Sequence, residues 1–359
     1  GVTLDGATDL VRGIGYDGAT GMMTSWQTAA GVQDPNLLFS SFVTHEVTPD
    51  GYHARPKRIQ ALDASLQVFY DSGVYDYDEL GNITAIGSDW SYGYDQLNRL
   101  TFATYHPTSE TLAFSYDDFG NRSEQADPAT NRLTGTGVDY DALGNLVEQP
   151  MPPPDDGTAW TRHLRFDAGN RLMAAWGVNG SAPPDAYAFA YDAAGERVVR
   201  YRVAPGQQSG LDEVQAADLY LRDESGNVLT ELMWWPTEPG GDTGAWVRER
   251  DWVYLGREPA VRLDHQSDSD EPDGFDLFAS TLVHDHLGSI RAEVAGSGLY
   301  TTVDYSPYGE IIDTFTTKAH TSALTELHLF TSHEREYLGS EPNPMQGLDY
   351  MHARYYSPG

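Results

Sequence analysis

The chain contains no cysteine among its 359 residues. Disulfides, thiolate nucleophiles and cysteine metal ligands are therefore excluded together. The absence does not decide the compartment, because a large β-protein with an extensive sheet can be exported without disulfides.

Basic residues are also scarce, and only two of the 22, Lys57 and Lys318, are lysines. Against 54 acidic residues they leave a formal net charge of -32 at pH 7. This charge opposes the approach of phosphate groups, so we expect no nucleic-acid partner. No run of 18 or more apolar residues occurs, so we expect no membrane span. The start at Gly1, without an initiator Met or a signal sequence, indicates a processed or trimmed piece.

Sustained apolar spacing of helical period is missing from the chain. Instead, 36 Gly, 20 Pro, 22 Tyr, 12 Phe and 8 Trp indicate a turn-rich β-protein. Short aromatic-rich segments, often alternating in polarity, are the candidate strands. They include Leu112–Tyr116, His163–Phe166, Tyr187–Tyr191 and Val198–Val203. The sequence therefore predicts an all-β fold.

A repeat dominates the central part of the chain. An aromatic residue is followed by Asp and then by a small-residue turn that ends in Asn, Arg or Glu. Start-to-start spacings of 17, 22, 24, 26 and 25 residues leave room for two strands and two turns, so each unit is predicted to be a β-hairpin. The copies are Tyr77–Ile83, Tyr94–Leu100, Tyr116–Arg122, Tyr140–Leu146, Phe166–Leu172 and Tyr191–Arg197, with a looser copy at Tyr16–Met22.

The chemistry of the turn follows from its residues. The Asp side chain can accept hydrogen bonds from backbone donors two residues on, and Gly or Asn can adopt the positive φ that reverses the chain. Tyrosine rings at alternate strand positions are expected to meet across neighbouring hairpins. The glycines expected at positive φ are Gly81, Gly120, Gly144, Gly169 and Gly195.

Composition divides the chain into four segments. Residues 1–75 are interpreted as degenerate repeats and residues 76–235 as regular hairpins. Proline-rich insertions around 150–157 and 182–185 are expected in loops or at sheet edges. Residues 236–280 combine strands with acidic loops. Residues 281–359 hold a series of distinct motifs.

Those motifs are His284–Arg291, Asp304–Glu310, Phe330–Arg335 and Gly347–Tyr356. In order and spacing they resemble the Rhs repeat-associated core domain. Together with the Tyr-Asp repeats, the chain resembles the Rhs/YD-repeat family over roughly residues 10 to 359. That family includes bacterial polymorphic-toxin shells, the C components of Tc toxins and, more distantly, the teneurins.

The resemblance implies hairpins joined edge to edge into one spiralling sheet, a hollow shell that the core domain closes. It implies a secreted or cell-surface protein that encloses or presents a C-terminal toxin or effector. We expect this segment to be non-enzymatic, because the repeats are architectural and no catalytic constellation is found in the sequence. Family shells have more repeats, so this chain is expected to be part of one or to pair with another copy through strand edges. Ser357 stands where the family usually has Asp, so no self-cleavage residue is carried over.

Two other classes of function remain open at this stage. An extracellular adhesin or filament-forming protein could use the same repeats to contact glycans or proteins, with aromatic side chains as a carbohydrate platform. Paired acids for glycoside hydrolysis are defined by their separation in space, which sequence does not give. We expect no enzyme, no cofactor and no metal.

Two local patterns suggest sites but have plainer interpretations. The string of Gly13, Gly15 and Gly18 matches a dinucleotide-binding pattern, yet a repeat turn follows where a helix would be needed. The loop 266–276 could offer calcium the carboxylates of Asp268, Asp270, Asp273 and Asp276, but composition favours a solvated acidic loop.

Charged residues of the C-terminal motifs suggest two further contacts. His284 and His286 could share a metal, although no third ligand is identifiable, and a structural role is the preferred interpretation. The arginines of the motifs are expected to pair with acids such as Glu310 or Glu334 and so to lock the closing segment to the sheet. These arginines are Arg291, Arg335 and Arg354.

Overall fold

The structure is a computed structural model. It describes residues 2–4, 8–29, 38–48, 51–63, 65–122, 126–127, 129–151, 160–178, 186–203, 214–237, 243–267, 275–295, 300–316, 331, 334–337, 347–351 and 354–356. These residues form 29 β-strands and no α-helix. The prediction of an all-β fold is confirmed.

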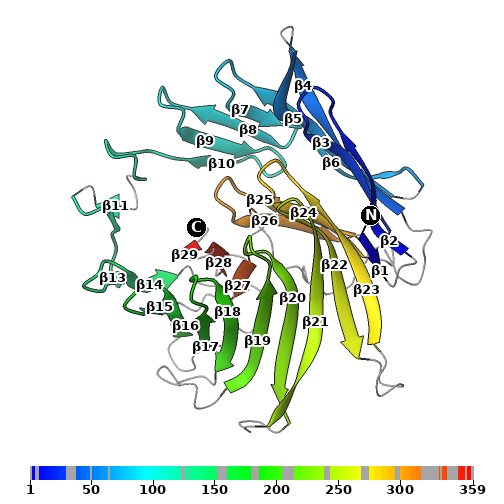
Figure 1. Cartoon of the computed structure of the whole chain (residues 1–359). Helices are drawn as coiled ribbons and strands as arrows, with labels where there is room; N and C mark the ends of the chain where they lie inside the picture. Colours follow the sequence, from blue (N-terminus) through cyan, green and yellow to red (C-terminus); the bar gives the residue numbers. More distant parts are fainter. Residues whose placement is uncertain are drawn as a thin grey trace.

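Ten strands form the first sheet, and each pairs antiparallel with the next strand along the chain. Figure 1 shows this sheet in blue to cyan at the top of the molecule. Its strands are β1 (Val2–Leu4), β2 (Thr8–Tyr16), β3 (Met23–Ala29), β4 (Leu38–Thr48), β5 (Gly51–Leu62), β6 (Val68–Tyr77), β7 (Ile83–Ile86), β8 (Trp90–Tyr94), β9 (Leu100–Tyr105) and β10 (Glu110–Ala113).

Fourteen strands, again in chain order, form the second sheet. They are β13 (Asp139–Tyr140), β14 (Leu146–Met151), β15 (Trp160–Phe166), β16 (Leu172–Val178), β17 (Ala186–Tyr191), β18 (Arg197–Val203), β19 (Val214–Arg222), β20 (Val228–Pro236), β21 (Gly244–Leu255), β22 (Glu258–Ser267), β23 (Phe275–His284), β24 (Ile290–Ala295), β25 (Tyr300–Tyr305) and β26 (Ile311–Thr316). Pro150 lies in β14, near the edge of this sheet.

Two small sheets complete the described structure. β11 (Ala126–Asp127) and β12 (Arg132–Leu133) form a short hairpin between the two large sheets. β27 (Glu334–Tyr337), β28 (Gly347–Met351) and β29 (Arg354–Tyr356) form a three-stranded sheet near the end of the chain. The strand order within every sheet follows the sequence, as expected for a series of hairpins.

The repeat turns have the predicted geometry, as the unit at Asp141 illustrates. Its Oδ1 accepts hydrogen bonds from the backbone N of Leu143 at 2.9 Å and of Asn145 at 2.8 Å. The Asn145 amide donates to Oδ2 at 2.9 Å, and this bond is the main cause that lowers the pKa of the Asp141 carboxyl. The aspartates of the other regular copies accept the same two backbone bonds: Asp78, Asp95, Asp117, Asp167 and Asp192.

One of the five glycine predictions is wrong. Gly81, Gly120, Gly144 and Gly195 have φ between 87° and 91°, but Gly169 does not have a positive φ, and Asn170 takes the left-handed conformation at 60°. The left-handed residue is the fourth counted from the Asp. In this copy only Ala168 and Gly169 stand between Asp167 and the Asn, whereas three residues separate the Asp from the Asn or Glu in the copies with a left-handed Gly. Asn170 therefore occupies the fourth position and adopts the left-handed conformation itself.

Further turns of the same geometry lie outside the copies found in the sequence. Asp223, Asp285 and Asp63 each accept backbone bonds from the residues two and four positions on. In the sequence, the turns at Asp223 and Asp285 are marked by a Gly at the fourth position from the Asp, but no Tyr precedes the Asp. The turn at Asp63 lacks this Gly too, and Leu66 takes the left-handed conformation there with φ 61°. The motif around Asp285 is therefore a repeat turn, and its strands continue the second sheet.

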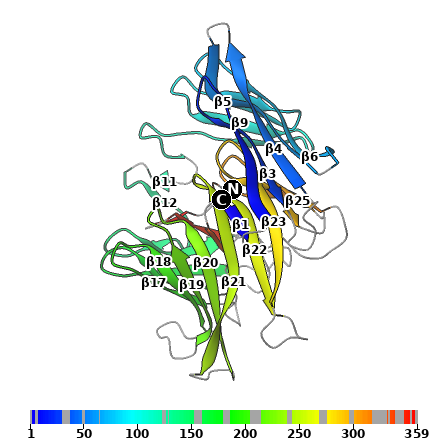
Figure 2. The same cartoon turned by 45° about the vertical axis from the view of Figure 1, so that its right-hand side comes forward.

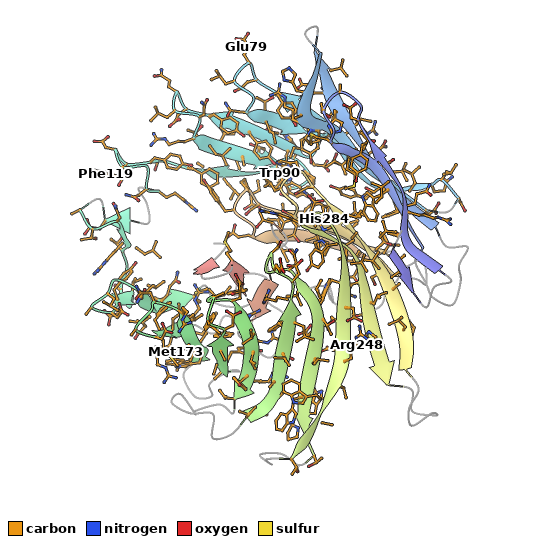
Figure 3. All side chains as sticks on the ribbon, viewed as in Figure 1. Glu79, Trp90, Phe119, Met173, Arg248 and His284 are labelled. Atoms are coloured by element: carbon orange, nitrogen blue, oxygen red, sulfur yellow. The ribbon has the colours of Figure 1, made fainter. Side chains whose placement is uncertain are left out.

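The two large sheets pack face to face over β22–β26. Leu10 and Trp26 of the first sheet form a buried cluster with Val261 and Leu263. Trp90 and Tyr105 belong to another buried cluster, against which Tyr308 packs. In Figure 3, Trp90 and His284 lie toward the centre of the molecule, whereas Glu79 and Phe119 project outward from turns.

The opposite face of the second sheet carries the C-terminal strands. Leu348 of β28 is buried in one cluster with Tyr187 and Phe189 of β17. The backbone N of Arg197 donates to the hydroxyl of Tyr350 at 2.7 Å. We call this side the inner face, and both views show the second sheet curving around β27–β29 (Figures 1 and 2). No described segment forms a helix long and apolar enough to cross a membrane.

Candidate functional site

Side chains link successive repeat turns into a row. The Asn82 amide donates to Asn98 Oδ1 at 3.0 Å, and the acceptor is the left-handed residue of the next turn. The same link joins Asn145 to Asn170 at 2.9 Å. A third link, from Asn121 to Asn131, leads from the first sheet to the β11–β12 hairpin. Asparagine side chains thus link three pairs of successive turns.

Between the two large sheets the described residues have a backbone ladder only within the β11–β12 hairpin, and side chains connect this hairpin to the second sheet. The backbone N of Leu133 donates to the Tyr140 hydroxyl at 2.7 Å, and the Arg132 guanidinium lies 4.9 Å from the centre of the Tyr140 ring. Asn145 then connects this unit to the next turn. We call the region from Asn121 to Tyr140 the seam, because side chains hold it together where the sheets are interrupted.

The repeat tyrosines bind the preceding hairpin through their hydroxyls. Tyr94 donates to the carbonyl of Ile83 at 2.9 Å, and Tyr116 donates to that of Leu100 at 2.7 Å. Both acceptors lie five residues after the preceding Asp. The Arg99 guanidinium also lies 4.7 Å from the centre of the Tyr116 ring. Tyr94 and Tyr116 thus contact the preceding hairpin through a hydroxyl and a backbone carbonyl, and the pairing of their rings across hairpins stays a prediction.

A polar centre built around Arg291 joins the two large sheets. Its Nε donates to the carbonyl of Val303 at 2.8 Å, and its guanidinium pairs with Asp304 and, at 3.6 Å, with Asp285. From the first sheet, the Tyr105 hydroxyl donates to Asp304 Oδ2 at 3.1 Å. The C-terminal motifs thereby contact the N-terminal sheet through charge-assisted bonds.

The expectation that the motif arginines pair with acids is confirmed for Arg291, although its partners are Asp285 and Asp304. Among the described side chains Glu310 is not one of its partners, because the long-range register decides which carboxylates reach this position, and the side chain of Glu334 lies outside the described part. The side chains of Arg335 and Arg354 lie outside the described part of the structure.

Aromatic side chains around the Arg291 centre are held neutral. Burial raises the pKa of the Tyr70 and Tyr75 hydroxyls well above the usual range. Burial also lowers the pKa of His286, whose Nδ1 lies 3.3 Å from the Tyr75 hydroxyl. The polar contacts of Arg291 with residues of both sheets favour a role of this centre in packing the sheets together.

A second cluster of charge lies on the inner face of the second sheet, on adjacent strands β19, β20 and β21. Oxygen atoms of Asp218, Glu231 and Glu249 all lie within 4.8 Å of one another. Asp218 and Glu231 are buried, and Glu231 is only 1% exposed. Burial raises the pKa of Glu231 to about 7 and also raises that of Glu249. We call these three residues the inner carboxylate cluster.

Guanidinium groups flank the inner carboxylate cluster. Arg200 pairs with Asp218 at 2.7 Å. Arg250 contacts Glu231 at 3.2 Å, Glu249 at 3.1 Å and Asp264 at 3.3 Å. Asp264 is also paired with Arg262 at 2.9 Å, which in turn reaches Glu293 at 2.6 Å. Groups of opposite charge thus lie side by side on six of the seven strands from β18 to β24.

The chemistry open to this cluster is limited by its surroundings. A divalent cation prefers a shell of oxygen ligands, and the adjacent guanidinium groups oppose its entry. A saccharide would have to lie between the carboxyl groups, whereas Glu231 is almost fully buried. The cluster was missed from the sequence because its members become neighbours only through strand register.

The remaining sequence candidates do not form sites. Gly13 and Gly15 lie within strand β2, which a turn and strand β3 follow, so the string lacks the helix needed to hold a phosphate. His284 ends β23 and His286 lies in the turn beyond it. The group of three close metal-type ligands in the described residues includes neither histidine. The acidic loop from Asp268 to Asp273 and the side chain of Asp276 lie outside the described part.

No protein-family model and no curated protein matches this chain. Solved structures that align with it include TcdB2-TccC3-Cdc42 (14% identity, 95% of this chain, 22% of that chain, TM-score 0.39) and TcdB2-TccC3-TEV (15%, 97%, 22%, 0.33). A third is the Photorhabdus luminescens Tc holotoxin pore (15%, 94%, 21%, 0.28). This chain spans about a fifth of those chains. All these TM-scores lie below 0.5, so the likeness carries no argument about family or activity.

Proposed function

We propose that this chain is a non-enzymatic segment of a β-sheet shell, and that it encloses or presents polypeptide attached on its C-terminal side. The observation that carries the proposal is the position of β28. Leu348 and Tyr350 are 3% and 2% exposed against the inner face of the second sheet. The sheet therefore curves around the part of the chain that leads toward Gly359, as a wall around contents would.

In the proposed shell, each hairpin is connected to the next one along the chain. A single hairpin is marginally stable in water, so each unit depends on its neighbours. Backbone ladders, tyrosine hydroxyls and the row of turn amides all connect one hairpin to the next. The two buried polar groupings also favour a structural role, since one ties the sheets together and the other spans the inner face.

Protease access tests the proposal. One variant carries a flexible extension with a protease cleavage site after Gly359, and a control carries the same extension before Gly1. We expect slower cleavage of the C-terminal extension in the intact chain. Leu348→Asp, which places a charge in the buried cluster, should remove that protection and leave the N-terminal rate unchanged. Equal cleavage of both extensions in the unaltered chain would refute enclosure.

A second candidate function, an adhesin, is favoured by the β20–β21 hairpin. Trp235 and Trp246 are 50% and 49% exposed near its end. Trp246 lies opposite Trp234, and Trp235 lies opposite Ala245, so the two exposed indoles are on different faces. Exposed indoles can contact the apolar faces of sugars or of a protein partner. Binding to a panel of surface glycans that Trp246→Ala and Trp235→Ala both abolish would support this function. No binding by the unaltered chain would reject it.

A further inference from the structure

The inner carboxylate cluster is short of positive charge. Glu231 and Glu249 share one guanidinium, that of Arg250, which also contacts Asp264. Asp218 has Arg200 as its own partner, and Asp264 has Arg262. The buried Glu231 and the half-buried Glu249 depend on one shared cation, so they carry an uncompensated negative charge when both are ionised, and the low exposure of the pair makes this unfavourable.

Two oxygen atoms show the same deficit independently. Glu231 Oε1 and Glu249 Oε2 are both buried, and within the described part of the chain neither has a hydrogen-bond partner. A buried carboxylate oxygen without a donor loses its hydration and gains nothing in return. Protonation of one carboxyl removes the surplus charge and also relieves this loss.

We propose that Glu231 and Glu249 form a buried proton-binding site that holds one proton at neutral pH on the inner face of the sheet. The ligand is a proton rather than a metal ion. Arg200 and Arg250 already contact the carboxylates of this cluster, and their charge repels a divalent cation. Calcium would also need six to eight oxygen ligands.

The groups that surround the site come from five strands of the second sheet. Tyr220 lies directly opposite Glu231 in the register, and Arg250 lies opposite it on the other side. The charged groups around the pair are Arg200 on β18, Asp218 on β19, Arg250 on β21, Asp264 and Arg262 on β22, and Glu293 on β24. The raised pKa of Glu231, about 7, and that of Glu249 agree with a site that ionises reluctantly.

Proton binding has a definite consequence for stability. An acid whose pKa is raised in the folded state keeps its proton there, while the unfolded chain has lost it. Stability is therefore greatest below the ordinary pKa of 4.5 and falls as pH rises toward about 7. Within this window one proton changes the unfolding equilibrium constant by about tenfold per pH unit. The repeat aspartates, whose pKa is lowered, respond in the opposite direction.

The test compares denaturant unfolding of the full chain between pH 5 and pH 8 for Glu231→Gln, Glu249→Gln and the unaltered protein. Gln mimics a protonated carboxyl, so Glu231→Gln should remove about one proton from the pH dependence and be the more stable form at pH 8. Glu224→Gln, in the exposed turn between β19 and β20, is the matched control and should follow the unaltered protein.

Three outcomes would overturn the proposal. The first is a pH profile of Glu231→Gln parallel to that of the unaltered protein. The second is stabilisation of the unaltered protein by calcium or magnesium at pH 8 that this variant lacks, because the site would then bind a cation. If the variants do not fold, infrared spectra of the unaltered protein decide. A protonated carboxyl band present at pH 6 and lost at pH 8 supports the proposal, and its absence at both pH values is the third contrary outcome.

Discussion

Gly195 and Gly169 provide a matched test of the turn geometry, because they lie in neighbouring hairpins and only one needs a left-handed backbone. Gly195 has φ 91°, and a methyl group added there would have no heavy atom within 4 Å. Gly195→Ala therefore isolates the backbone effect. A left-handed conformation disfavours residues with a Cβ by about 1–2 kcal/mol, and we expect the turn to lose that much stability.

Gly169→Ala should be close to neutral. Its φ lies outside the left-handed region, and the one tight contact of its new methyl group would be with Asp167 Oδ1 at 3.3 Å, since Arg171 Nε at 3.8 Å is at ordinary van der Waals distance. The small displacement that this contact requires is opposed by a gain of about 0.4–1 kcal/mol, because alanine restricts the unfolded chain. The same chemical change thus has different effects two strands apart.

Hydrogen exchange, followed peptide by peptide, measures the difference locally. In Gly195→Ala the amides of the Asp192 turn should exchange about 5–30 times faster, which corresponds to the expected energy. Distant hairpins should be nearly unchanged, because each unit contacts mainly its neighbours. Equal protection in the two variants, or loss of protection throughout the chain, would refute the assignment of the fourth turn residue as the conformational requirement.

Other predictions concern the links between units. Asn145→Ala should weaken its own turn and that of Asn170 by about 1 kcal/mol, which hydrogen exchange in both turns would show, and an effect on one turn alone would contradict the link. Arg291→Ala should lower the unfolding free energy, measured by denaturant unfolding, by about 3 kcal/mol, because it leaves Asp285 buried without its cation. The control Arg248→Ala removes an exposed arginine and should change the unfolding free energy by less than about 1 kcal/mol. Equal effects would show that the Arg291 centre does not join the sheets. The pKa of the repeat aspartates is lowered in the folded chain, so the hydrogen-exchange protection of the turns should be complete above pH 3.8 and should be lost as the pH falls below it. Exchange rates that stay constant down to pH 2, after correction for intrinsic rates, would contradict this.

Local features of the fold could be predicted from the sequence. The Asp141 turn is set by residues within five positions of one another, and β17 and β18 coincide closely with the predicted strands Tyr187–Tyr191 and Val198–Val203. The turn at Asp63 could not be found, because Leu66 occupies a position where Gly or Asn is expected. Tertiary packing evidently outweighs the local preference there. The four-segment division of the chain stays a prediction.

The candidate sites depended on contacts that the sequence does not encode locally. Tyr105 meets Asp304 across 199 positions, and Glu231 meets Glu249 only because a bulge in the β20–β21 pairing adds a residue beside Arg250. A shift of register by one residue would move such side chains to the opposite face. Acid pairing by Arg291 was predictable from charge, whereas the identity of its partners was not.

The seam between the two large sheets also has a mechanical meaning. A backbone ladder resists bending because many parallel bonds must distort together. From Asn121 to Tyr140, however, side-chain contacts along one rim hold the units together. A single row of such contacts resists sliding of one hairpin past the next along the rim, but it resists rotation of the hairpins about the rim only weakly. The seam therefore bends more easily than the paired strands on either side of it, whereas the buried clusters over β22–β26 and the bond from Tyr105 to Asp304 oppose rotation of the two large sheets about it.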